Sequence, residues 1–332
     1  MWYTNTGKNG DIVLSSRVRL ARNIKGIPFA GKMTETDELT VLEKLKPVAE
    51  KNGLNFFSLK DFPLYEKQAL AEQHIISPDM LDNSRQRGLI ISPDNRTSIM
   101  LCEEDHIRIQ CMQEGFALEE CLKNAVETDN LIEEEIDYEF HQDLGYLTCC
   151  PSNLGTGMRA SVMVHLPAHT KTGKINSVIR NFSKIGLTVR GLYGEGSKAS
   201  GNIYQVSNQI TLGLTEEEII EKLTGFITEL TENERKLQKE LYDTEKFVLE
   251  DKIMRSYGTL KNAVILSSSE TLNLISHVRM GVNLGIIKDI TLGTLNEIFY
   301  ATLPGNIIKK YNLEGSAERD LKRAEIIKER LK

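Results

Sequence analysis

Apolar positions divide the chain into two kinds of region. Up to about Gly213, short apolar runs typical of strands are mixed with amphipathic helices, without the regular alternation of a parallel sheet. The pattern predicts helices at 35–52 and 117–136, and strands within 11–20, 87–94, 97–112, 145–167, 187–196 and 201–213. This mixture predicts an α+β fold, in which an antiparallel sheet is surrounded by helices.

After Gly213 the hydrophobic pattern changes from mixed strands and helices to helices. Thr215, followed three residues later by Glu218, forms the capping-box pattern that starts a helix. From there to Lys332 the pattern is almost wholly helical. We therefore predict two domains, an α+β domain at 1–225 and a helical C-terminal domain at 226–332.

The composition of the chain argues against several classes of protein. The chain has 332 residues, of which 40% are hydrophobic, but no run approaches eighteen apolar residues and the first residues lack the pattern of a signal peptide. We therefore expect a cytoplasmic protein outside the membrane. The formal net charge of -6 argues against general nucleic-acid binding. The five cysteines form no C-x-x-C pair, so we expect reduced thiols, no disulfide scaffold and no zinc site.

Arginines recur in strands or beside turns. Arg17 and Arg19 lie two apart in "SSRVRLARN", so their side chains would share one face of a strand. This pair is either the charge of an edge strand or a clamp for an anion. Further arginines occur in "EEDHIRI" (Arg108), "GTGMRAS" (Arg159) and "TVRGLYGEG" (Arg190). Singly, each is more typical of a surface charge than of a ligand.

The neighbours of these arginines favour phosphate chemistry. The glycines of "CPSNLGTGMRAS" suit a tight loop whose backbone N–H groups approach phosphate. Glu104 lies in the acidic "EEDH" stretch, and Glu195 stands between two glycines in "YGEGS". Because a guanidinium is so basic, a carboxylate must orient it and accept its proton if it is to attack phosphorus. P-loop, dinucleotide and protein-kinase motifs are missing from the sequence. Carboxylates and arginines together suit phosphoryl transfer to a basic nitrogen.

Four stretches in this order, "SSRVRLARN", "EEDHIRIQ", "CPSNLGTGMRASV" and "RGLYGEG", resemble the ATP:guanido phosphotransferase family, the phosphagen kinases. The resemblance implies ATP and Mg²⁺ as cofactors. It implies that five arginines surround the phosphates: Arg17, Arg19, Arg108, Arg159 and Arg190. It also implies that Glu104 and Glu195 hold the acceptor guanidinium, and that Cys150 contacts it in a positioning or electrostatic role.

The chain also has two candidate histidines and three departures from the family pattern. His74 and His106 are candidates near the nucleotide, and a packed structural role is equally open for each. The chain departs from the family pattern at Cys102, Ser152 and Met163. The last replaces a family histidine, which makes that contact to adenine apolar.

Within the family, the chain is most similar to the branch that phosphorylates arginine side chains in proteins. The strand with Arg17 begins near the start of the chain, without the preceding helical domain of the metabolite kinases, which predicts an open acceptor site. The helical tail resembles the substrate-binding and dimerising domain of that branch. Arg319 and Asp320 in "ERDLKRA" match its regulatory phosphoarginine site, and a charged helix end with i,i+4 pairs is the alternative interpretation.

The resemblance further implies protein substrates with exposed arginines, an activator protein, a homodimer and delivery of marked proteins to a Clp-type protease. Two other functions stay open. One is a kinase for free arginine or a similar metabolite. The other is a phosphoarginine-binding adaptor without catalysis, against which the presence of both Glu104 and Glu195 argues.

Overall fold

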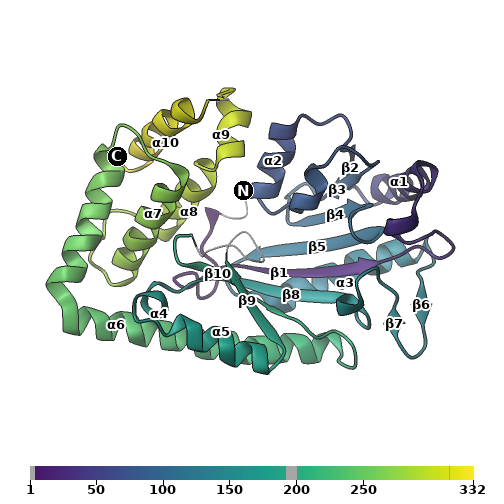
Figure 1. Ribbon diagram of the computed structural model, residues 1–332, viewed down its shortest axis with the longest axis horizontal. Coiled ribbons are helices and arrows are strands. Elements are labelled where there is room, and N and C mark those ends of the chain that lie inside the picture. Colours follow the sequence, from purple (N-terminus) through teal and green to yellow (C-terminus); the bar gives the residue numbers. More distant parts are fainter. Residues whose placement is uncertain (1–3, 192–199, 314) are drawn as a thin grey trace.

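A computed structural model describes residues 4–191, 200–313 and 315–332 of the chain (Figure 1). Within these ranges the main sheet has eight strands in the order β2-β3-β4-β5-β1-β8-β10-β9, and every neighbouring pair is antiparallel. The strands are β1 (Val13–Arg22), β2 (Asn55–Ser58), β3 (Gly88–Ile91), β4 (Thr97–Leu101), β5 (Ile107–Glu114), β8 (Met158–His165), β9 (Leu187–Gly191) and β10 (Ile203–Asn208). A small separate hairpin pairs β6 (Phe140–His141) with β7 (Gly145–Tyr146).

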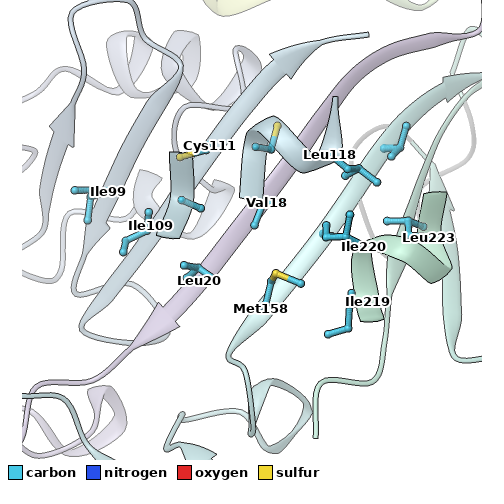
Figure 2. Packing of buried hydrophobic residues seen from close by; sticks show 14 of the residues in the cluster. Val18, Leu20, Ile99, Ile109, Cys111, Leu118, Met158, Ile219, Ile220 and Leu223 are labelled. Carbon is cyan, nitrogen blue, oxygen red and sulfur yellow. The ribbon is translucent and has the colours of Figure 1, made fainter. Parts of the chain in front are cut away.

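The antiparallel sheet surrounded by helices confirms the predicted fold class. One face carries the main core. Strand residues such as Val18, Leu20 and Met158 pack there against helices that lie far apart in the sequence (Figure 2). These helices are α1 (Glu35–Lys51), α3 (Leu118–Glu133), α5 (Ile175–Lys184) and the first part of α6 (Glu216–Asn262). The capping box predicted at Thr215 and Glu218 starts α6.

The opposite face of the central strands is polar because side chains alternate along each strand. Val18 and Leu20 of β1 are fully buried in the core, whereas Arg17 and Arg19, which alternate with them, point to the other face. At one end this face is covered by α2 (Leu64–Glu72) and the short 3₁₀ helix η3 (Pro78–Leu81), above a small apolar cluster that includes Met80 and Met100. The sequence pattern did not single out these covering segments.

Helix α6 joins the two halves of the chain. It runs beneath the sheet and then turns toward the C-terminal helices, with non-helical backbone at Glu245 (Figure 1). The predicted domain boundary at 225 therefore lies inside a continuous helix. Along α6 the buried residues pass from the sheet core, up to Leu230, to a second core that begins at Leu237.

The second core is formed mainly by C-terminal helices: α7 (Ser268–Asn283), α8 (Leu292–Ala301), α9 (Pro304–Tyr311) and α10 (Ser316–Arg330). The short helix α4 (Pro167–Lys171) packs between the two halves. None of the helices in the described ranges combines the length and apolar composition that crossing a bilayer requires.

The C-terminal helices also contact the N-terminal half of the chain through α2 and α9. The Glu72 carboxylate, at the end of α2, accepts hydrogen bonds from the backbone N–H groups of Gly305 (2.8 Å) and Asn306 (3.2 Å), in the first turn of α9. A carboxylate is favourable at a helix N-terminus, where backbone donors are unpaired. A Cβ atom on Gly305 would lie 2.7 Å from the Ala69 backbone nitrogen, so only glycine allows this close approach.

Candidate active site

A cavity of about 1010 Å³ opens on the polar face of the sheet. Its walls come from the strands β1, β8 and β9, the turn between β4 and β5, the segment from η3 to β3, and the loop around the short helix η4 (Pro151–Asn153). Six of the residues predicted from the sequence line it: Arg19, Arg108, Arg159, Arg190, Glu104 and Cys150. The topology therefore brings together stretches that are separated by up to about 170 positions in the sequence, from Arg19 to Arg190.

The pairing register of the strands places the arginines close together on one face of the sheet. Strand β1 lies between β5 and β8, and Arg19 is directly opposite Arg159 of β8. Arg108 of β5 is opposite Ala21, and Arg190 of β9 is opposite Gln205 of β10. Residues two apart on a strand, or directly opposite on its neighbour, share a face. The arginines therefore project from one face into one cavity.

The cavity is strongly cationic. Burial lowers the pKa of Arg19 well below its usual value, and the neighbouring charges of Arg17, Arg108 and Arg159 lower it further. Burial and then Arg190 and Arg108 lower the pKa of Arg159. The buried Arg19 Nε has no hydrogen-bond partner in the described part of the chain. Like charges in close contact with an unpaired donor are costly without a ligand, so the arrangement indicates a polyanion such as a nucleotide phosphate chain.

Arg17 differs from the other predicted arginines. It does not line the cavity, and its guanidinium donates to Ser161 Oγ (3.2 Å), Gln110 Oε1 (3.4 Å) and Gln205 Oε1 (2.9 Å) on the three surrounding strands. Burial, then Arg108 and Arg159, lower its pKa to about 10. In this structure Arg17 therefore connects β5, β8 and β10 by hydrogen bonds on the polar face of the sheet.

The acidic turn between β4 and β5 supplies the carboxylates. Glu103 is buried and forms an ion pair with Arg108. Burial raises the pKa of Glu103, but Arg108 and hydrogen bonds outweigh this effect and lower it overall. Glu104 lines the cavity, and burial followed by the negative charge of Asp105 raises its pKa. Glu103 therefore positions Arg108, whereas Glu104 has the proton affinity that suits a base.

Asn23, at the end of "SSRVRLARN", fixes this turn. Its Nδ2 donates to Asp105 Oδ1 (2.7 Å) and to the Leu147 carbonyl (2.9 Å), and its Oδ1 accepts the His106 backbone N–H (3.0 Å). Asp105 Oδ1 also accepts the Cys149 backbone N–H (2.7 Å). The end of β1, the "EEDH" turn and the "CPSN" loop are thus joined by one buried polar network.

We predict that Asn23→Ala lowers the free energy of unfolding by about 1–3 kcal/mol, because buried donors and acceptors lose their partners. It should also lower kcat, because the turn that carries Glu104 loses its anchor. Chemical denaturation and steady-state kinetics would measure the two effects. Asn52→Ala, which removes one bond to the Val48 carbonyl away from the cavity, should leave kcat unchanged. An unchanged kcat in both variants would show that Asn23 does not position the turn.

The loop before Arg159 places Cys150 at the cavity. Cys150 Sγ lies 3.0 Å from Ser152 Oγ, at the start of η4. Gly155 and Gly157 both have positive φ, and a Cβ on Gly157 would lie 2.6 Å from the Ala21 carbonyl oxygen. Gly157 therefore lets the loop pack against β1, whereas Gly155 lets it pack against the Thr211 carbonyl oxygen, 2.6 Å from where a Cβ would lie. All five cysteines are free.

The two predicted histidines lie outside the residues that line the cavity. His106 is fully buried; its Nδ1 accepts the Ile24 N–H (3.0 Å), and its Nε2 lies 2.8 Å from the Pro28 carbonyl, to which it donates in that tautomer. His74 has a φ of 59°, and burial followed by Arg17 and Arg19 lowers its pKa to about 3. Both are therefore neutral packed residues in this structure, which favours the structural alternative.

Two further predictions lie away from the cavity or beyond the described residues. Glu195 falls in 192–199, outside the described ranges. Asp320 of α10 forms an ion pair with the buried Arg323, and Arg323 also donates to the Thr302 and Leu266 carbonyls. Asp320 thus has a structural partner, and a regulatory role of Arg319 and Asp320 stays a prediction.

Sequence reasoning missed two residues at this site. Asn23 was quoted within the first motif but received no role, although a buried asparagine needs partners for all its polar atoms. Arg87, which also lines the cavity, was not considered. The only signal for Arg87 was its place directly before an apolar strand, which resembles the place of the other arginines.

Comparisons with known proteins agree with this geometry. The family model described as ATP:guanido phosphotransferase, C-terminal catalytic domain, matches residues 37–237. The model described as protein-arginine kinase McsB C-terminal domain matches residues 246–332. The chain is 44% identical to a protein-arginine kinase of Desulforamulus reducens, covering 99% of this chain and 95% of the relative. It is also 44% identical to that of Bacillus subtilis, covering 99% and 93%.

Solved structures give the same picture for the catalytic half. The duplicated taurocyamine kinase of Schistosoma mansoni, with bound transition state analog components, matches with a TM-score of 0.62 at 30% identity, over 67% of this chain and 33% of that chain. A lombricine kinase matches with a TM-score of 0.61 at 26% identity, over 69% of this chain and 67% of that chain.

Proposed function

The chain belongs to the ATP:guanido phosphotransferase family and is a protein-arginine kinase, and we propose that its cavity transfers the γ-phosphoryl group of ATP to the guanidinium of arginine residues in proteins. One observation supports this reaction above the others: Arg19, Arg108, Arg159 and Arg190 line the same cavity as the Glu104 carboxylate. Cations for a phosphate chain and a base for a guanidinium therefore lie at one site.

The cavity arginines and Glu104 have different roles in this reaction. The arginines would hold the phosphates in line and stabilise the negative charge that develops on the transferred group. Glu104 would orient the acceptor guanidinium and accept its proton as the N–P bond forms, while the bond from phosphorus to the leaving oxygen of ADP breaks. Its raised pKa supports this role, since a stronger base accepts the proton more readily. Glu195 is proposed as the second carboxylate, by family resemblance.

Magnesium fits the donor set of the cavity. No group of three or more potential metal-ligating side chains occurs in the described ranges, so the chain offers no ready-made cage there. Mg²⁺ usually binds through nucleotide phosphates, water and one or two carboxylates, and Asp79 and Asp82 line the cavity. When bound with ATP, the ion would add positive charge at the phosphates.

We further propose that the substrates are proteins with exposed arginines, that an activator protein and a Clp-type protease act with the enzyme, and that it dimerises, responds to stress and works in the cytoplasm. The support is the resemblance of the sequence to the protein-directed branch, together with the matching C-terminal domain. Regulation by phosphoarginine at Arg319 and Asp320 is proposed on the same basis.

The test is to incubate the protein with ATP and Mg²⁺, beside unfolded casein in one reaction and free arginine in another. We expect acid-labile, base-resistant phosphate on casein arginines, located by mass spectrometry. Phosphate on free arginine alone would instead identify a metabolite kinase. ADP binding without any phosphate transfer, also after addition of cell extract that supplies an activator, would favour a phosphoarginine-binding adaptor.

A further inference from the structure

A second cationic group lines the cavity away from the phosphate arginines. Arg87, just before β3, is 7% exposed, and its Nε and Nη1 atoms have no hydrogen-bond partner within the described residues. Nearly all buried polar groups in proteins are paired, and an unpaired buried guanidinium is costly. Two unpaired donors on one buried side chain that lines a cavity therefore indicate an anionic ligand.

Lys67 of α2 adds to this positive charge. Its side chain is 1% exposed, and its ammonium group donates to Asn83 Oδ1. Burial lowers the pKa of Lys67, and the charge of Arg87 is the next cause, which places the two cations near each other. Asp82 interacts with both, but it is solvent-exposed and its carboxylate accepts hydrogen bonds from Ser84. Asp82 is thus a carboxylate that both cations share, and its one negative charge does not balance the two positive charges.

The position of Arg87 separates it from the nucleotide phosphates. Its strand β3 is two strands from β5 and three from β1 in the sheet, on the side opposite to β8 and β9. With about 4.8 Å between neighbouring strands, β3 and β1 are roughly 14 Å apart. The turn that carries Glu104 connects β4 and β5, between these two places. An acceptor guanidinium at Glu104 would have the phosphates on one side and Arg87 on the other.

We propose that Arg87, with Lys67 beside it, binds a carboxylate carried by the acceptor, so that the enzyme prefers arginines with an acidic group nearby. This inference rests on the proposed function and narrows its substrate class. The planar guanidinium of Arg87 can donate charge-assisted hydrogen bonds to a carboxylate, which gives the contact directional specificity. The carboxylate is that of a neighbouring aspartate or glutamate in a polypeptide, or the α-carboxylate of free arginine.

The test uses two unstructured peptides that differ only in the residues flanking one arginine, glutamate in one and alanine in the other. For the wild-type protein we expect a KM roughly fivefold to thirtyfold lower for the glutamate peptide, the size of one charge-assisted contact. Arg87→Gln should bring the two KM values together, and Arg87→Lys should restore part of the difference. Arginine against agmatine, which lacks the α-carboxylate, tests the second source in the same way.

Arg96→Gln is the matched control, because Arg96 pairs with Glu114 outside the cavity; it should keep the wild-type preference. The affinity for ADP should be the same in Arg87→Gln and wild type. A wild-type protein that labels both peptides with equal KM overturns this inference and leaves the kinase activity intact. Weaker ADP binding in Arg87→Gln, with an unchanged peptide preference, also overturns it, since Arg87 would then bind phosphate. If the wild type labels no arginine at all while it binds ADP, the proposed function itself fails.

Discussion

Glu104→Gln is expected to lower kcat by about 10²–10⁴-fold, because the amide cannot accept the proton that leaves the guanidinium. ADP affinity should change little, since the phosphates are bound by the arginines on the other strands. Steady-state phosphorylation of an arginine-containing peptide, with ADP binding measured by calorimetry, would test both points. Glu127→Gln, on the exposed surface of α3, should match the wild type in both measurements.

The same substitution should make the protein more stable at neutral pH. The fold raises the pKa of Glu104, so the folded state holds this proton more tightly than the unfolded chain does. Its contribution to stability is therefore greatest in acid and falls as the pH rises above the ordinary pKa of a glutamate. Removing the charge should raise Tm at pH 7, and the gain should vanish in acid. A lower Tm at pH 7 would contradict this interpretation.

Arg159→Gln is expected to lower kcat/KM by about 10²–10³-fold, the usual cost of removing one donor that stabilises transition-state charge. Arg159 lies directly opposite Arg19, at the centre of the cationic cavity. Fluorescence titration should also show weaker ADP binding. Arg180→Gln, on the exposed face of α5, is the matched control and should behave as the wild type.

Melting temperatures with and without ADP distinguish a ligand-binding role of Arg159 from a structural role. Burial and the charges of Arg190 and Arg108 disfavour the Arg159 cation in the ligand-free protein, so the variant should melt at a higher temperature than the wild type. Added ADP should then raise Tm less in the variant than in the wild type. A variant that melts lower, yet gains as much from ADP, would assign Arg159 a structural role.

The shared face of Arg17 and Arg19 could be predicted from the alternation of β1, and the structure places both on the polar face. The alternation could not tell which of them reaches the cavity. That depends on Gln110, Ser161 and Gln205, which belong to three other strands and occupy the donors of Arg17. Pairing across strands is a long-range property, which a local pattern does not contain.

Local sequence patterns also could not predict the surroundings of His106 and Arg87 or the course of helix α6. For His106 the sequence left a nucleotide contact and a structural role equally open, and in the structure both ring nitrogens lie at hydrogen-bond distance from the backbone of residues 24 and 28. Arg87 has no distinctive motif, and only its unpaired atoms at the cavity reveal it. The helical nature of the C-terminal part was predictable from periodicity, whereas the passage of one helix through the expected boundary depends on packing against two cores.

The contact between Glu72 and the start of α9 has an evolutionary consequence. The two halves meet where Gly305 lies against the backbone of α2, with no space for a side chain. A C-terminal domain exchanged from a relative would fit only if it brought glycine at this position and met a carboxylate at the end of α2. We therefore expect exchange of this domain between relatives to succeed only where both residues are kept, although 233 positions separate them in the sequence.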